Sequence, residues 1–133
     1  MGEIRIGKVS SVDYDAGMIK VVYQDKDGAT TKLLPVFSLD GEYKMPDVDQ
    51  YVLVVHLSNG SEAGVVLGTF WNNAAKPAKT GKGVFRKELA SKHGEAFLQY
   101  EGGTLEINAN NIKFVSAAGT RTMAQIIEKL NKI

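Results

Sequence analysis

Residues 98–114, LQYEGGTLEINANNIKF, repeat a short pattern of apolar side chains every seven positions. The first series is Leu98, Leu105 and Ile112, and the second is Tyr100, Ile107 and Phe114. Small or polar residues separate the units, namely EGG at 101–103, NANN at 108–111 and SAAG at 116–119. Each unit is therefore predicted to be a very short strand with one apolar face, followed by a turn.

Such a ribbon has too few apolar side chains to stabilise itself. Ordering residues 97–115 costs conformational free energy at every position, and the repeating side chains bury too little surface to offset it. Three identical ribbons wound around one axis would close each apolar face against two neighbours. The alternative is an antiparallel meander that folds back onto the N-terminal barrel predicted below, with the C-terminal helix as its lid. A single-chain β-helix is disfavoured because stacked repeats need about three units and protective caps.

The last residues predict an amphipathic helix that also needs a partner. Thr122 is a candidate N-cap, and Gln125 follows at the spacing of a capping box. The apolar residues at helical spacing are Met123, Ile126, Ile127, Leu130 and Ile133. A lone helix of about eleven residues is marginal in water, so three helices could close the column as a bundle. The predicted trimer interface comprises Leu98, Tyr100, Leu105, Ile107, Ile112, Phe114, Ile126, Ile127 and Leu130.

Residues 1–72 have the pattern of a small closed or nearly closed β-barrel. The expected strands cover 4–12, 19–24, 30–36, 51–57 and 64–71, with a bulge or bend at Gly7 and a turn at Ser58–Ser61. Residues 51–57 are almost all apolar, which indicates a strand buried on both faces. The predicted organisation is a barrel at 1–72, a linker at 73–83, the ribbon at 84–118 and the helix at 119–133.

Composition excludes several classes of site. The 133 residues contain no cysteine, which excludes a disulfide framework, a thiolate metal site and a cysteine nucleophile. The formal net charge of +1 gives no electrostatic footprint for nucleic acid or an anionic membrane. The start of the chain lacks the apolar run of a signal peptide, and no stretch has the length of a membrane span. We therefore expect a protein made in a cytoplasm and soluble there.

The candidate chemical groups favour structural roles. His56 lies in the apolar strand 51–57, and we expect a histidine with satisfied hydrogen bonds in a barrel or an interface. His93 belongs to a predicted turn and is expected to be solvated. Neither stands at a recognisable spacing from a nucleophile or a carboxylate. Asp13 and Asp15 could bind a cation, but a turn stabilised by aspartate side chains is favoured. We expect no catalytic residue, metal or cofactor.

Four elements between residues 3 and 73 follow one another in a characteristic order. They are Gly7-x-Val9 with Val12-Asp13, a strand ending at Leu34-Pro35, Pro46 before Tyr51-Val52-Leu53-Val54, and Gly64-Val65-Val66-Leu67-Gly68 followed by Phe70-Trp71. With the glycine-rich ribbon after them, these elements resemble the phage baseplate assembly protein V family. This resemblance implies an all-β chain: an N-terminal OB-fold barrel, then a short intertwined trimeric β-helix or β-prism, ending here in a C-terminal α-helix.

The resemblance also implies a function and partners. Proteins of this family form the central spike of contractile tails, beneath the hub at the tip of the tail tube, and help to perforate the target envelope. Related spikes occur in R-type bacteriocins. The implied partners are two further copies, the hub and tube proteins and, transiently, the target cell envelope. The implied location is a virion or bacteriocin-like particle that is assembled in the bacterial cytoplasm.

The chain departs from the longer spikes of that family in two respects. Some members end in a metal-binding apex with a His-x-His element, whereas the histidines here are His56 and His93, so the metal site is not carried over. The chain also ends in a predicted helix instead of a tapered β tip. It is therefore either the piercing point itself or a short plug that carries a separate tip protein.

Two other functions stay open from the sequence. An OB-type barrel could bind single-stranded nucleic acid by stacking bases on aromatic residues; the candidates are Tyr14, Tyr23, Phe37, Tyr43 and Tyr51. The mixed charges of this region argue against a groove that follows phosphates, and we expect no nucleic-acid partner. A small cell-wall hydrolase would need paired carboxylates or a nucleophile, and the sequence shows no such constellation.

Overall fold

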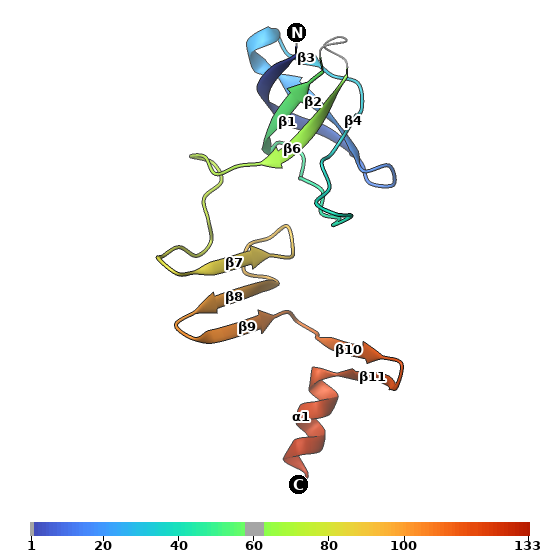
Figure 1. Ribbon diagram of the computed structural model, residues 1–133, viewed down its shortest axis with the longest axis vertical. Coiled ribbons are helices and arrows are strands. Elements are labelled where there is room, and N and C mark those ends of the chain that lie inside the picture. The colour runs from blue at the N-terminus through green and yellow to red at the C-terminus, as the bar shows by residue number, and fades with distance from the viewer. Residues whose placement is uncertain (1, 58–62) are drawn as a thin grey trace. The chain divides into compact units, whose positions relative to one another are not determined.

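The computed structural model describes residues 2–57 and 63–133 (Figure 1). The chain divides into two units, residues 1–76 and 77–133, and the boundary falls inside the predicted linker. The regular secondary structure of the described residues is mostly β-strand, with one α-helix at the C-terminal end, so the predicted all-β class with a terminal helix is confirmed. Within these residues, no helix has the length and apolar character needed to cross a bilayer.

The N-terminal unit is one sheet that returns to its first strand. Its elements are β1 (Glu3–Asp13), β2 (Met18–Tyr23), the short 3-10 helix η1 (Gln24–Lys26), β3 (Ala29–Thr30), β4 (Leu34–Pro35), β5 (Tyr51–His56) and β6 (Gly64–Thr69). The strand order is β3-β2-β1-β5-β6, and β4 also pairs with β2. A parallel bridge between Val36 and Val66 joins the residue after β4 to β6. The pairing path therefore runs from β1 through β2, β4, β6 and β5 back to β1.

Alternate side chains of these strands fill the interior of the N-terminal unit. The fully buried residues are Val9, Ile19, Val21, Leu34, Val52, Val54 and Val66. Along β5, the buried residues Val52, Val54 and His56 alternate with half-buried ones. The interpretation of this strand as buried on both faces is therefore wrong for the single chain. β5 lies between β1 and β6 in the sheet. One of its faces packs against the core, and the other faces outward.

The predicted strand over 30–36 is interrupted. β3 pairs with the end of β2 and β4 with its start. Between them, the Thr31 hydroxyl accepts a hydrogen bond from the Val21 amide at 3.0 Å, while the Thr31 amide donates to the Val21 carbonyl at 2.8 Å. The side chain therefore replaces a carbonyl in the β-ladder, and the regular strand stops here.

The bulge in β1 lies between Val9 and Ser11 instead of at the predicted Gly7. Gly7 serves a different purpose, since a Cβ at this position would stand 2.8 Å from the ring of Tyr23. Glycine is needed here because the backbone passes directly over buried side chains. The predicted turn at Ser58–Ser61 lies outside the described residues.

The C-terminal unit contains a three-stranded sheet, a hairpin and the helix. The elements are β7 (Phe85–Glu88), β8 (Phe97–Glu101), β9 (Thr104–Asn108), β10 (Lys113–Ser116), β11 (Gly119–Thr122) and α1 (Met123–Asn131). The sheet has the order β7-β8-β9, and β10 pairs with β11. The repeat units thus form the short strands β8, β9 and β10, as predicted. Gly102 and Gly103 have φ values of 58° and 83°, which suit the two-residue turn that reverses β8 into β9.

The helix begins as predicted. The Thr122 hydroxyl accepts from the Gln125 amide at 3.2 Å, and the Gln125 side chain accepts from the Thr122 amide at 2.9 Å. This reciprocal capping box satisfies two amides at the start of α1. The next amide, of Met123, donates to the Ile112 carbonyl at 2.7 Å, which fastens the start of the helix to the residue before β10.

Candidate functional site

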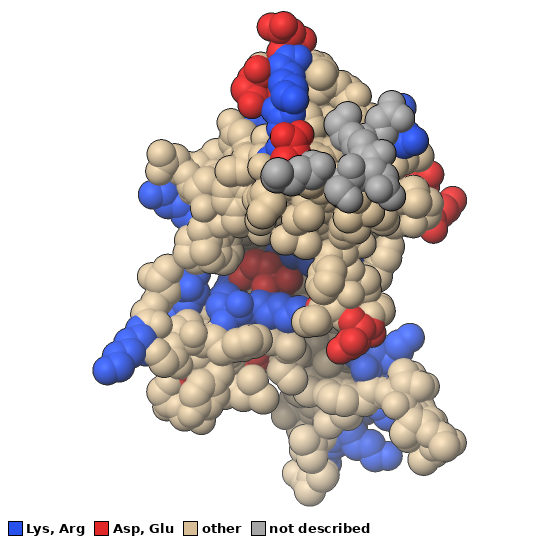
Figure 2. All heavy atoms as spheres, turned by 45° about the horizontal axis from the view of Figure 1, so that its top comes forward, with Lys and Arg blue, Asp and Glu red and all other residues tan. Residues whose placement is uncertain are grey.

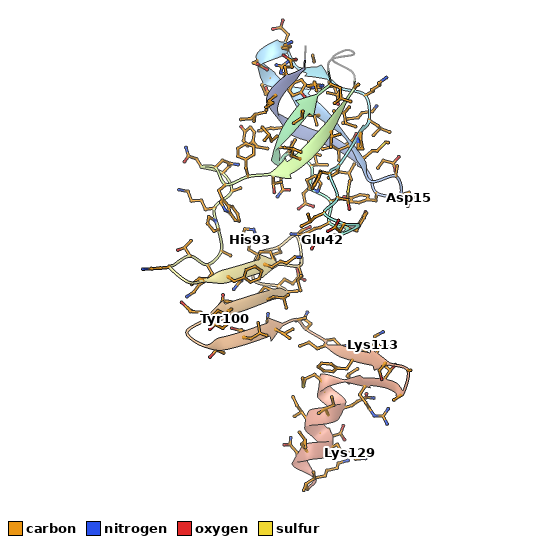
Figure 3. The ribbon with its side chains drawn as sticks, in the orientation of Figure 1. Asp15, Glu42, His93, Tyr100, Lys113 and Lys129 are labelled. Carbon is orange, nitrogen blue, oxygen red and sulfur yellow. The ribbon has the colours of Figure 1, made fainter. Side chains whose placement is uncertain are left out.

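The register of the three-stranded sheet gathers the repeating apolar residues on one face. Leu98 stands opposite Ile107, and Tyr100 opposite Leu105. On the other side of β8, Phe85 stands opposite Tyr100. Because alternate residues of a strand share a face, these five residues lie together, and we call them the apolar face. Figure 3 shows the side chains of this sheet, with Tyr100 labelled.

The apolar face is open to solvent in the single chain. Leu105 is 65% exposed, Phe85 57%, Ile107 53% and Tyr100 46%, and Leu98 is half-buried. A sheet with one apolar face normally packs against another layer of structure that buries this face. Here no such layer covers the apolar face within the described residues.

The opposite face of the sheet is held by polar contacts. The Arg86 guanidinium lies 3.5 Å from the ring centroid of Phe97, which is 9% exposed, and donates to the Gln99 side chain at 2.7 Å. It also donates to Glu88, whose other oxygen accepts from the Gly94 amide at 2.8 Å. The hydrogen bond from Arg86 lowers the pKa of the Glu88 carboxyl. This network ties the loop between β7 and β8 to the sheet.

The remaining predicted interface residues lie on the hairpin and the helix. Phe114 is 47% exposed, Ile127 50% and Leu130 60%, while Ile112 and Ile126 are half-buried. None of the nine predicted interface residues is buried within the chain. The single chain pairs the residues of β8 and β9 with each other in an antiparallel sheet, which is the strand pairing of the alternative meander, and it leaves the whole set without a covering layer.

Phe85 lies on the apolar face but is not among the nine residues predicted for the trimer interface. It lies outside the seven-residue period because β7 precedes the repeating units. The sequence contains no clear signal for Phe85, because Lys87, which shares a face with Phe85 and stands opposite Leu98, is charged. The pairing of β7 with β8 is what adds its ring to the apolar face.

A second polar cluster lies in the N-terminal unit. His56 is 3% exposed, and its Nε2 lies 2.5 Å from the Tyr23 hydroxyl. Its Nδ1 lies 3.3 Å from the Ala63 carbonyl, so Nδ1 carries the proton and Nε2 accepts from Tyr23. The Arg5 guanidinium stands 4.2 Å from the Tyr23 ring centroid and donates to both oxygens of Asp25 at 2.7 and 2.9 Å. Burial raises the pKa of Tyr23. The prediction of a satisfied buried histidine is confirmed.

The other candidate groups have local roles. His93 is exposed in a turn, as predicted. Asp13 accepts from the Ala16 amide at 3.1 Å, which confirms the turn stabilised by an aspartate side chain. Within residues 2–57 and 63–133, no group of three or more His, Asp or Glu side chains is placed to hold a metal ion. Both acidic and basic side chains appear on the face that Figure 2 shows.

Comparison of the sequence with models of known protein families gave no match, and comparison with curated proteins gave none either.

Proposed function

We propose that this chain is the homotrimeric central spike of a contractile tail baseplate, in a phage, a prophage or a bacteriocin-like particle. In this proposal it is a structural protein without catalytic activity. It attaches below the tail tube and hub and takes part in penetrating the target envelope. The observation that carries the proposal is the exposed apolar face on β7, β8 and β9.

The N-terminal unit supports an OB-fold barrel. Its pairing path returns to β1 through five strands, with a long β1 that pairs with both β2 and β5. The elements that resemble the baseplate family form β1, β4, β5 and β6 of this sheet. Acidic residues outnumber basic ones over residues 1–76, which disfavours the alternative of a barrel that binds nucleic-acid phosphates.

The C-terminal unit supports association in threes. Its apolar face contains large side chains that a single chain leaves about half exposed, and three copies around one axis would cover each face with the other two. Among the described strands, β7 and β9 each pair on one side only, so their outer edges are available to neighbouring chains. The intertwined β-helix or β-prism of the proposal uses both features.

The terminal helix favours the same stoichiometry. Met123, Ile126, Leu130 and Ile133 recur at the alternating spacing of coiled-coil core positions. Leu130 then occupies the first core position of a heptad, and Ile126 and Ile133 the second. This combination of leucine and isoleucine favours assemblies of three or four helices over pairs.

The proposed role is mechanical. In a column of interdigitated strands, bending or separation breaks many backbone hydrogen bonds at the same time. Each of these bonds contributes only about 1 kcal/mol by itself, but their simultaneous loss makes the column stiff along its axis. Such a rod can transmit the axial force of sheath contraction.

The mass of the full chain in solution tests the proposal. Light scattering at micromolar concentration is expected to give the mass of three chains, and a stable monomer would contradict the spike. Antibody labelling of residues 123–133 in purified contractile particles tests the location. Label at the distal end of the tail tube is expected, whereas label along the sheath would contradict the assignment.

A further inference from the structure

The loop between β4 and β5, residues 36–50, contains no helix or strand and is held by hydrogen bonds of its own. The Leu39 carbonyl accepts from the Glu42 amide at 3.0 Å, across a turn in which Asp40 and Gly41 have φ values of 52° and 85°. Loops of this length inside a compact domain usually have a function. The loop is therefore a defined structure that can present side chains to a partner.

Two hydrogen bonds join this loop to the turn between β1 and β2. The Val36 amide donates to the Gly17 carbonyl at 3.0 Å, and the Tyr43 hydroxyl donates to the Tyr14 carbonyl at 3.1 Å. The turn and the loop therefore form one surface, although they lie far apart in the sequence.

Four large side chains of this surface are exposed. Leu39 is 65% exposed, Tyr43 64%, Tyr14 58% and Phe37 53%, and we call these four residues the tip surface. The same loop also contributes to the core, because Met45 packs against it. Aromatic side chains are enriched at protein interfaces, where they fill the apolar centre. The tip surface has the composition of such a centre.

The charge of the same two segments restricts the partner. Acidic residues far outnumber basic ones in residues 13–17 and 36–50; the acidic residues are Asp13, Asp15, Asp40, Glu42, Asp47 and Asp49, and the basic residue is Lys44. Figure 3 labels Asp15 on the turn and Glu42 on the loop. Negative charge repels the phosphates of nucleic acid and of anionic lipids. It also opposes contact with the same surface of a second copy, because like charges would then meet.

We propose that the tip surface docks a different protein, whose contact surface has basic side chains around an apolar centre. An apolar centre with a polar rim is the usual anatomy of such an interface, and opposite charges on the two rims select the partner and its orientation. This inference goes beyond the function proposed above, since it uses neither the apolar face nor a trimer.

Selection of short random peptides displayed on yeast cells tests the proposal, with the full chain as the bait. The enriched peptides are expected to combine lysine or arginine with large apolar residues. Leu39→Ser should weaken their binding at least about tenfold, as the loss of a central interface residue does. The matched control is Leu57→Ser at a 50% exposed leucine, which follows the end of β5 remote from the loop. Circular dichroism verifies that both variants are folded.

The variant Asp40→Asn tests the role of charge. Asparagine tolerates the left-handed backbone that Asp40 adopts, so the substitution removes the charge and keeps the turn. Binding of the same peptides should weaken, and its decrease with added salt should become less steep.

Each outcome decides the proposal. Basic and apolar peptides that lose affinity for Leu39→Ser and Asp40→Asn, but not for Leu57→Ser, support the docking surface. Peptides that bind Leu39→Ser as tightly as the natural chain contact another surface and overturn it. Enrichment of acidic peptides, or of none, also overturns it. A monomeric mass of the natural chain in light scattering would contradict only the proposed trimer and leave this inference intact.

Discussion

At the scale of single residues, the buried pair of Tyr23 and His56 makes the N-terminal unit sensitive to the loss of one oxygen. Tyr23→Phe removes the donor to Nε2 of His56, a residue that is 3% exposed. The unpaired acceptor is expected to lower the free energy of unfolding by about 1–3 kcal/mol, measured by urea unfolding. The control is Tyr14→Phe at a 58% exposed ring. Equal losses in the two variants would contradict the role of the pair.

The lowered pKa of the Glu88 carboxyl is expected to make the stability of the folded chain depend on pH. Its pKa lies below the ordinary value of 4.5, chiefly because Arg86 donates a hydrogen bond to it. The unfolded chain therefore takes up the proton first, so the stabilisation is complete at neutral pH and is lost as the pH falls below 4.5. Thermal unfolding should show a smaller acid-induced loss for Glu88→Gln than for the natural chain. Glu95→Gln, at an exposed carboxyl, should retain the full loss.

At the scale of elements, the strands and the helix follow from local patterns, whereas the irregularities do not. The alternation in residues 98–114 and the pair Thr122 and Gln125 determine β8, β9 and the start of α1 without reference to distant residues. The break after β3 depends on a hydrogen bond between Thr31 and Val21. That contact joins residues ten positions apart, and no local pattern reveals it. Gly7 likewise acquires its role only when Tyr23 lies beneath it.

The capping box makes α1 depend on one hydroxyl. Thr122→Ala removes the acceptor for the Gln125 amide and is expected to reduce helix stability by about 1 kcal/mol. A short helix is near the limit of stability in water, so the ellipticity at 222 nm should fall. Thr122→Ser keeps the hydroxyl and should restore the signal. An unchanged spectrum for Thr122→Ala would mean that packing with other chains, and not the cap, maintains the helix.

At the scale of the whole molecule, the sequence contains more apolar strand faces than a single chain buries. Residues 51–57 have the composition of a strand covered on both sides, yet only the side with Val52 and Val54 is buried. Residues 98–107 likewise present an apolar face that stays open. A sequence pattern specifies which face is apolar and with what period, but the identity of the covering surface depends on symmetry and on other chains. This explains why the strands were predictable and their assembly remains a proposal.

The apolar face supplies the sharpest test of assembly. Ile107→Asp adds a carboxylate beside Leu98 and Leu105, and in a trimer three such charges would approach one axis in apolar surroundings, where an unpaired charge is strongly unfavourable. The variant is expected to lose the trimeric mass in light scattering, while circular dichroism still shows the folded N-terminal unit. Asn110→Asp adds the same charge at an exposed position three residues away and should remain trimeric. A trimer that survives Ile107→Asp would show that the apolar face lies outside the interface.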